Sequence, residues 1–260
     1  MQKNFLNWPR CIVLISILIP SSILAQSEQD SYLSKTIINP QTLKHKILQA
    51  ETGYQFILKG ESDYNQNSAQ ILVRYGLYKR LEFFISSTTS FLANKPENEN
   101  ETNVIQEGSG GLKLNIMRSR KKFSLWSPGI SLIGGSTYKT SEDNIYAPFG
   151  GLAISWYFTK IFKMEANGLY FYQEEEKKKY NQFITGVCFK LFLRKWTVHI
   201  GHYNKMPGTY NGEYEYIAEA GFIYFFSDII SFFLKTGRGI YGNNETCFAF
   251  GSSFLLKNMY

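Results

Sequence analysis

The stretch that most constrains the fold lies close to the C-terminus, between Thr246 and Leu256. Large apolar residues occupy one parity and small or polar residues the other: Phe248, Phe250, Phe254 and Leu256 against Ala249, Gly251 and Ser253. Successive side chains of a strand point to opposite faces, so this stretch is predicted to be a strand with one apolar face. About eleven residues suffice for a tilted strand to cross a bilayer. A strand of this kind near the C-terminus is typical of the closing strand of a bacterial outer-membrane β-barrel.

The same alternation recurs along the chain and predicts further strands. They are expected at about residues 45–58, 68–77, 81–91, 108–117, 123–134, 148–158, 162–172, 182–193, 196–203, 214–226 and 229–238. Pro128 lacks an N–H donor and is expected to mark a bulge in its strand. Connections after the even strands are predicted to be short and the others long, as in bacterial barrels, which have an even strand number. The predicted fold class is therefore all-β, a closed antiparallel transmembrane barrel of about 12 strands. A secreted soluble β-sandwich, the alternative, would not need so many outward Phe and Tyr residues.

The N-terminal region carries an export pattern. Lys3 and Arg10 precede a short apolar run, and Ala25 ends a small-residue cleavage site, so residues 1–25 are predicted to be a signal peptide. The alternative is an uncleaved membrane anchor. Residues 26–44 are polar and aperiodic, and we expect a periplasmic N-terminal arm or a plug segment there, with the barrel at residues 45–260. The expected location is the outer membrane of a Gram-negative-type bacterium. The expected partners are outer-membrane lipid and, during insertion, the barrel-assembly and chaperone machinery.

Charge and cysteine content exclude several classes of function. Without residues 1–25, which hold Lys3 and Arg10 and no acid, the net charge of +7 falls to a mild +5. It forms no basic cluster, so no nucleic-acid partner is expected for an exported chain. No Cys/His spacing resembles a metal site, and neither a metal nor a cofactor is predicted. Cys188 and Cys247 fall on the inward parity of separate strands, and the sequence leaves open whether they form a disulfide.

Ionisable residues of inward parity are the candidate lumen-lining groups. They are Glu51, Arg74, Glu82, Lys113, Glu165, Lys190, His199 and Glu219, accompanied by Glu215 and Lys235. Buried charges must be paired or hydrated, so one interpretation is an interior salt-bridge network that fills the barrel. The other is a narrow solute path lined by Arg74, Glu82 and Lys113. Inward glycines are expected to leave room for such a path: Gly53, Gly111, Gly186, Gly201 and Gly221.

Aromatic residues gather at the predicted strand ends, where interfacial girdles lie in outer-membrane barrels. One girdle is expected near the short turns, formed by Trp156, Tyr157, Phe158, Trp196, Phe225 and Phe226. A second is expected near the long loops, formed by Phe91, Tyr170, Tyr172, Tyr214 and Tyr241.

Several segments, in order, match the pattern of one known family. They are Gln-Ala-Glu-Thr-Gly-Tyr at 49–54, Leu-Val-Arg-Tyr-Gly-Leu at 72–77, Arg-Leu-Glu at 80–82, Gly-Ser-Gly-Gly-Leu-Lys at 108–113, Pro-Gly-Ile-Ser-Leu at 128–132 and the final strand. Over residues 40–256 the chain resembles the outer-membrane β-barrel transporters named for the meta-pathway of phenol degradation. It departs from them at 38–40, where the family often has an Arg-Pro-Asp-like stretch, and at Gly111, where an acid is common. The resemblance implies outer-membrane transport without a defined substrate.

The predicted function is passive transport of small solutes, including hydrophobic or aromatic ones. The alternative is a structural or adhesin-type barrel that acts through its extracellular loops. An enzyme would need a nucleophile, a His base and an orienting group near one rim. The sequence offers only His45, His199 and His202, and no Ser-His-acid arrangement is evident. We therefore predict no catalytic residues.

Overall fold

A computed structural model describes residues 39–59, 64–94, 103–118, 127–140, 145–175, 178–206, 214–241 and 245–257. The predicted signal peptide and residues 26–38 of the predicted arm lie outside the described residues. The strands are β1 (Ile47–Lys59), β2 (Tyr64–Tyr78), β3 (Leu81–Asn94), β4 (Asn103–Met117), β5 (Gly129–Thr140), β6 (Ile145–Tyr157), β7 (Phe162–Glu175), β8 (Lys178–Leu193), β9 (Trp196–Met206), β10 (Glu215–Phe225), β11 (Ile230–Tyr241) and β12 (Glu245–Lys257).

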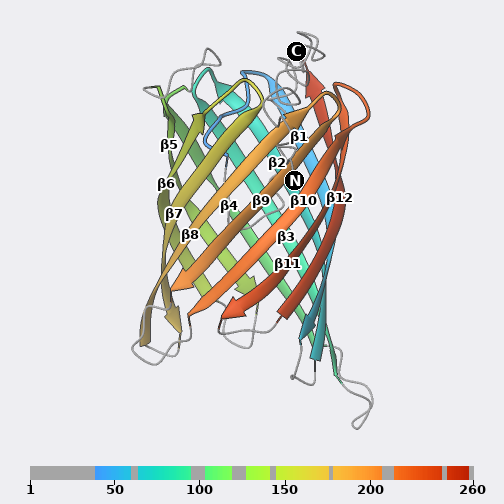
Figure 1. Ribbon diagram of the computed structural model, residues 1–260. Helices are drawn as coiled ribbons and strands as arrows, with labels where there is room; N and C mark the ends of the chain where they lie inside the picture. The colour runs from blue at the N-terminus through green and yellow to red at the C-terminus, as the bar shows by residue number, and fades with distance from the viewer. Residues whose placement is uncertain are drawn as a thin grey trace, which may run out of the picture.

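These twelve strands form one closed antiparallel barrel (Figure 1). Each strand pairs with its neighbours in sequence, and β1 pairs with β12 along its whole length, from Ile47 opposite Lys257 to Lys59 opposite Glu245. Closure leaves no sheet edge unpaired, which is what a sheet surrounded by hydrocarbon requires. The predicted fold class is confirmed, and the β-sandwich alternative is wrong.

The two faces of β12 follow the predicted parity. Phe248, Phe250 and Phe254 are exposed on the outside, whereas Ser253 and Leu255 are buried inside. The other strands repeat this pattern, with exposed outward side chains such as Ile71, Phe83, Ile85, Leu112, Leu132, Phe189, Ile200, Phe232 and Leu234. An exterior so rich in large apolar side chains is unfavourable in water and suits a bilayer. No helix among the described residues is long and apolar enough to span a membrane.

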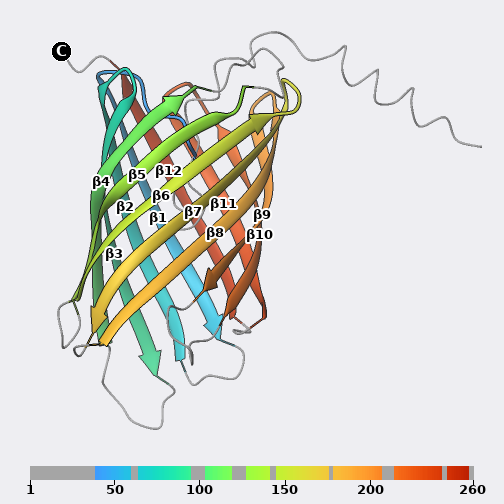
Figure 2. The same cartoon turned by 90° about the vertical axis from the view of Figure 1, so that its left-hand side faces the viewer.

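The two ends of the barrel differ (Figures 1 and 2). One end, called here the short-turn end, holds the start of β1, the end of β12 and the turns at 79–80, 158–161, 194–195 and 226–229. The opposite end, called the long-loop end, holds the connections that follow the odd-numbered strands. The connection between β7 and β8 is only residues 176–177, so the prediction that all of these connections are long was wrong.

The region around Pro128 differs from the prediction. The strand expected at 123–134 begins only at Gly129, directly after Pro128, and continues to Thr140. Pro128 therefore precedes the strand and marks no bulge within it. A residue without an N–H is excluded from the ladder most simply when the strand starts after it. The connection from Met117 to Gly129 is consequently not short.

Two aromatic residues assigned to the outer girdle point inward. Tyr157 and Phe225 are buried on the lumen parity, so the expectation for them was wrong. Their neighbours Trp196 and Phe226 are exposed on the outside, as are Tyr214 and Tyr241 at the other end. Proximity to a turn places a residue at interface height, but strand parity decides which face it occupies.

Candidate solute path

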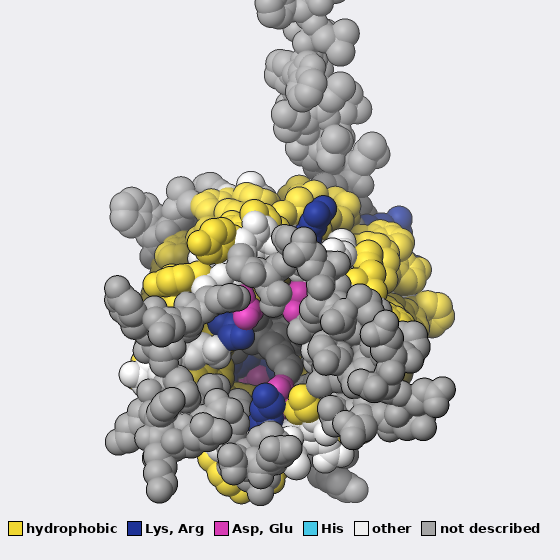
Figure 3. Space-filling model, turned by 90° about the horizontal axis from the view of Figure 1, so that it is seen from below, with side chains coloured by type: hydrophobic (Ala, Val, Ile, Leu, Met, Phe, Trp, Pro, Cys, Tyr) yellow, Lys and Arg dark blue, Asp and Glu magenta, His cyan; other side chains and the backbone are white. Residues whose placement is uncertain are grey.

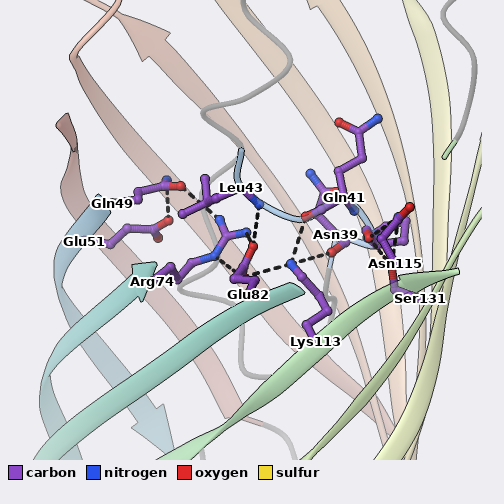
Figure 4. Close-up of polar contacts among 11 residues, drawn as sticks. Asn39, Gln41, Leu43, Gln49, Glu51, Arg74, Glu82, Lys113, Asn115 and Ser131 are labelled. Atoms are coloured by element: carbon purple, nitrogen blue, oxygen red, sulfur yellow. Dashed lines mark hydrogen bonds and ion pairs between the residues drawn. The ribbon is translucent and has the colours of Figure 1, made fainter. Parts of the chain in front are cut away.

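A chain of buried polar side chains runs along the inner wall near the short-turn end (Figure 4). It begins at the seam between β12 and β1, where Gln49 Nε2 donates to Ser253 Oγ at 2.9 Å and to Glu51 Oε1 at 2.8 Å. Arg74 Nη1 on β2 donates to Gln49 Oε1 at 2.9 Å. These bonds join the first two strands to the last one through side chains, in addition to the backbone ladder.

The chain continues into an ion cluster formed by Arg74, Glu82 and Lys113 from β2, β3 and β4. Arg74 forms a bidentate pair with Glu82, Nε to Oε1 and Nη2 to Oε2, both at 2.8 Å. Lys113 Nζ lies 3.0 Å from Glu82 Oε1. The three side chains are at most 3% exposed. Charges removed from water to this degree are stable only when paired and hydrogen bonded, and this geometry provides both.

Residues 39–44, called here the arm segment, lie against this cluster on the inside of the barrel (Figure 4). Lys113 Nζ donates to the backbone carbonyls of Asn39 at 3.3 Å and Gln41 at 2.8 Å, and the Leu43 N–H donates to Glu82 Oε2 at 2.7 Å. Further along, Asn115 Nδ2 donates to the Pro40 carbonyl at 3.1 Å. The barrel wall thus holds the arm segment through backbone groups, with Pro40 contributing only its carbonyl.

The arm segment enters β1 by passing over Gly76 of β2. A Cβ atom on Gly76 would lie 1.9 Å from the Lys44 carbonyl oxygen, so only glycine permits this approach. The Lys46 N–H then donates to the Gly76 carbonyl at 2.9 Å, and Lys46 adopts a left-handed φ of 63°. Leu43 packs in a buried cluster with Ile47 and Leu255. The arm segment is therefore fitted to the inner wall beside β2–β5.

A second ion cluster lies on β7 and β8. Lys163 Nζ lies 2.5 Å from Glu165 Oε1, and Lys190 Nζ lies 2.9 Å from Glu165 Oε2. Lys163 Nζ also lies 5.2 Å from the centre of the Tyr157 ring, close enough for a cation–π contact. Lys163 was missing from the predicted residues, although it shares the parity of Glu165 on the same strand.

The other predicted side chains lie on β9–β11. Lys235 Nζ lies 3.0 Å from Glu219 Oε2, and Lys205 Nζ lies 3.1 Å from Glu215 Oε1 nearer the long-loop end. The second pair is partly exposed, at 37% and 24%. Viewed from the long-loop end, the barrel is hollowed, and acidic and basic side chains are visible within the hollow (Figure 3). The exposed fractions fall toward the short-turn end, where the side chains of both ion clusters are buried.

Three phenyl rings form an apolar stripe on the inner wall of β3, β6 and β7, called here the phenyl stripe. The ring centres of Phe84 and Phe149 are 6.3 Å apart, and those of Phe149 and Phe171 are 5.3 Å apart. All three share the parity of inward residues and are partly exposed. The interior of an outer-membrane barrel is ordinarily polar, so an aromatic stripe there is a specific feature. Parity alone could have identified it, because Phe84 is two residues from Glu82.

Two of the predicted inward glycines, Gly111 and Gly221, do not leave the open space expected of them. A Cβ on Gly111 would lie 2.8 Å from the Phe84 ring, and a Cβ on Gly135 would lie 2.9 Å from the Phe149 ring. A Cβ on Gly221 would similarly lie 2.7 Å from the His199 ring. At these positions the absence of a side chain makes room for a neighbouring ring. The glycines therefore shape the wall and do not define a path by themselves.

The three histidines lie in different surroundings. His45 sits at the short-turn end, where its Nδ1 is 2.8 Å from the Leu77 carbonyl. His202 stacks on Tyr216, and His199 lies inside with an Nδ1 that has no hydrogen-bond partner. No group of three metal-ligating residues occurs in the described part of the chain. Cys188 and Cys247 are not joined by a disulfide.

A closed twelve-stranded barrel that is apolar outside and charged inside has the architecture of an outer-membrane β-barrel. Solved structures of this class are similar to the chain. An outer-membrane channel from Pseudomonas putida F1 is 10% identical, with a TM-score of 0.62 over 87% of this chain and 100% of the other. The KdgM porin is 13% identical, with a TM-score of 0.51 over 78% and 98%. The CymD monoaromatic hydrocarbon channel is 9% identical, with a TM-score of 0.50 over 86% and 92%.

No family model matches the chain, and no curated protein matches it. The resemblance to transporters named for the meta-pathway of phenol degradation is therefore not confirmed. At these sequence identities the similar structures establish the fold.

Proposed function

We propose that this barrel lies in the outer membrane of a Gram-negative-type bacterium, with its short-turn end toward the periplasm, and passes small solutes that carry an aromatic or other apolar group. The observation that carries the proposal is the phenyl stripe of Phe84, Phe149 and Phe171 on the inner wall. Aromatic rings bind flat apolar solutes through offset or edge-to-face packing.

The proposal is supported by the lumen, in which one inner wall is aromatic and the opposite inner wall carries ion pairs. In the strand order of the closed barrel, β11 stands diametrically opposite β5. The phenyl stripe is centred around β5, whereas the ion pairs Glu219–Lys235 and Glu215–Lys205 are on β9–β11. A solute between the walls could stack its ring on one side and hydrogen bond on the other. Because each acid is paired with a base, the wall exerts little net field and would not select small ions strongly.

The arm segment and the two ion clusters set the limit of free passage. Glu82, Lys113, Lys163 and Glu165 have almost no exposed surface, so no wide aqueous pore runs past them. Passage then requires the arm segment to move from the β2–β5 wall. Lys113, Asn115 and Ser131 donate hydrogen bonds to its backbone carbonyls, and Glu82 accepts one from its Leu43 N–H. We therefore expect low resting conductance.

Two similar structures are compatible with the proposal. One neighbour is a monoaromatic hydrocarbon channel, and another is a porin in complex with oligogalacturonate. Barrels of this architecture thus serve both apolar and polar solutes. The phenyl stripe favours the first group for this chain.

A pair of solutes that differ only in one ring tests the proposal. Liposomes that contain the refolded chain should take up phenyl β-glucoside several times faster than methyl β-glucoside, because only the first can pack a ring on the phenyl stripe. Bilayers are nearly impermeable to both sugars, so the uptake reports on the barrel. Phe149→Ala should reduce this preference severalfold. Phe248→Ala, which removes an equal ring from the outer face, should leave it unchanged. Equal uptake of the two glucosides, or equal effects of the two substitutions, would rule out the phenyl stripe as a solute contact.

A structural barrel is the second candidate, and the burial of both ion clusters near the short-turn end favours it. It predicts neither conductance nor uptake in any variant, including variants that release the arm segment. An adhesin would act through loops that lie outside the described residues, and surface binding without uptake would support it.

A further inference from the structure

Exposed basic side chains surround the short-turn end. They are Lys79, Arg80, Arg118, Lys160, Arg194, Lys195 and Lys257, called here the basic rim. Among the described residues of the connections at this end, Asp228 is the only acid. By contrast, the sequence of the connection after β3, at the other end, contains Glu97, Glu99 and Glu101. The molecule therefore presents a strongly basic edge at one end, and the expectation that its charge forms no basic cluster was wrong.

The basic rim borders the apolar exterior directly. Arg194 and Lys195 form the turn between Leu193 and Trp196, which are 37% and 43% exposed on the outer face. Phe226 and Ile229, on the neighbouring turn, are 63% and 49% exposed. A ligand at this boundary would meet cations at one end and apolar surface at the other. Aromatic side chains at such a height occupy the interface between headgroups and acyl chains.

Several of these cations are available for a ligand. Within the described part of the chain, Lys160, Arg194, Lys195 and Lys257 form no ion pair with a protein carboxylate. Arg80 Nη1 donates to the Ile116 carbonyl at 3.2 Å, and Arg118 Nη2 donates to the Lys79 carbonyl. Each guanidinium has five N–H donors, so both retain donors for an anion.

We propose that the basic rim binds the phosphate groups of anionic phospholipids in the leaflet at the short-turn end, with their acyl chains against the adjoining apolar side chains. The inference rests on the proposed membrane location but concerns a different surface from the solute path. Charge complementarity selects the headgroup, because phosphate oxygens accept charge-assisted hydrogen bonds from Arg and Lys. The binding would fix the depth of the barrel and favour one orientation.

The test uses the full chain refolded in detergent micelles, with bound lipid counted by native mass spectrometry. Phosphatidylglycerol should bind in preference to phosphatidylcholine with the same acyl chains. Arg194→Gln combined with Lys195→Gln should weaken phosphatidylglycerol binding, by roughly fivefold for each cation at low salt, since a basic residue near an anionic surface contributes about 1 kcal/mol. Salt at about 0.5 M should reduce the preference, because it shortens the range of electrostatic attraction.

The matched control is Lys139→Gln combined with Arg238→Gln, which removes the same net charge from β5 and β11 nearer the long-loop end. It should leave the lipid preference unchanged. If the Arg194/Lys195 variant fails to fold, Lys160→Gln combined with Lys257→Gln repeats the test on separate side chains. Inorganic phosphate at the lipid concentration should not displace the lipid, because it lacks acyl chains.

Each other outcome overturns the inference. A wild-type chain that binds both lipids equally has no phosphate site on the rim. Equal losses in the rim variant and its control would show a dependence on net charge alone. Displacement by inorganic phosphate would show a simple anion site. Failure of the wild-type chain to insert into any vesicle would instead contradict the proposed membrane location, and this result is distinguishable from a barrel that inserts without lipid preference.

Discussion

At the scale of single residues, Glu82 is the side chain on which the buried network depends. It pairs with Arg74 and Lys113 and accepts the Leu43 N–H. Glu82→Ala leaves two cations buried without their carboxylate, and loss of one partner from a buried pair costs about 3–5 kcal/mol. Urea unfolding of the refolded barrel should show this loss in the free energy of unfolding.

Glu215→Ala is the matched control for Glu82→Ala. Glu215 pairs with Lys205 at 3.1 Å, but both side chains are partly exposed to solvent. Such pairs contribute about 1 kcal/mol or less. Similar effects of the two substitutions would show that the β2–β4 cluster is hydrated and adds no more than a surface pair.

A second prediction at the scale of single residues concerns the outer face of the barrel. Phe250 lies in the middle of β12 and is half exposed on the apolar exterior. Phe250→Arg should destabilise the barrel in vesicles by about 2–4 kcal/mol, the cost of a basic residue near the bilayer midplane. Gln55→Arg, one residue along β1 from Tyr54, the partner of Phe250, places the same group on the inner face and should cost much less. Equal costs in a refolding titration would contradict the assignment of faces.

At the scale of elements, the arm segment is the part whose position decides whether the lumen is closed. Gly76→Ala places a methyl group where the Lys44 carbonyl lies, so the arm segment has to leave the β2 wall. Bilayer conductance should rise severalfold. Gly108→Ala is the control, because a Cβ there meets only the Ser86 carbonyl at 3.8 Å. Unchanged conductance in the Gly76 variant would show that the arm segment does not limit passage.

At the scale of the whole molecule, closure of the barrel depends on β12. This strand pairs with β1 and β11, so a chain that ends before Glu245 leaves both with unpaired edges. The full chain should migrate faster in detergent gels when unboiled than when boiled, because a closed barrel stays compact. The truncated chain should show a single mobility under both conditions. A heat-dependent shift in the truncated chain would mean that an eleven-stranded barrel can close.

The sequence by itself determined the architecture. Alternating parity identified all twelve strands and the outward residues of β12, because a strand has a side-chain period of two and the exterior had to be apolar. The same parity placed Arg74, Glu82 and Lys113 on the inner face. The predictions failed for Tyr157 and Phe225, because their inward parity was not applied. They also failed at Pro128, which was placed inside a strand.

Only the tertiary structure decided which inward residues meet. Parity gives a face, but the registers and the strand tilt determine that Glu82 joins Arg74 and Lys113, and that Glu165 joins Lys163 and Lys190. The arm segment has no periodicity from which its path could be derived, and its attachment uses backbone carbonyls that any residue supplies. Glycines likewise acquire a role only from their neighbours, since Gly76 and Gly111 accommodate a carbonyl and a ring from other segments. A closed sheet is specified locally, strand by strand, whereas the content of its lumen depends on distances across the barrel that sequence spacing does not encode.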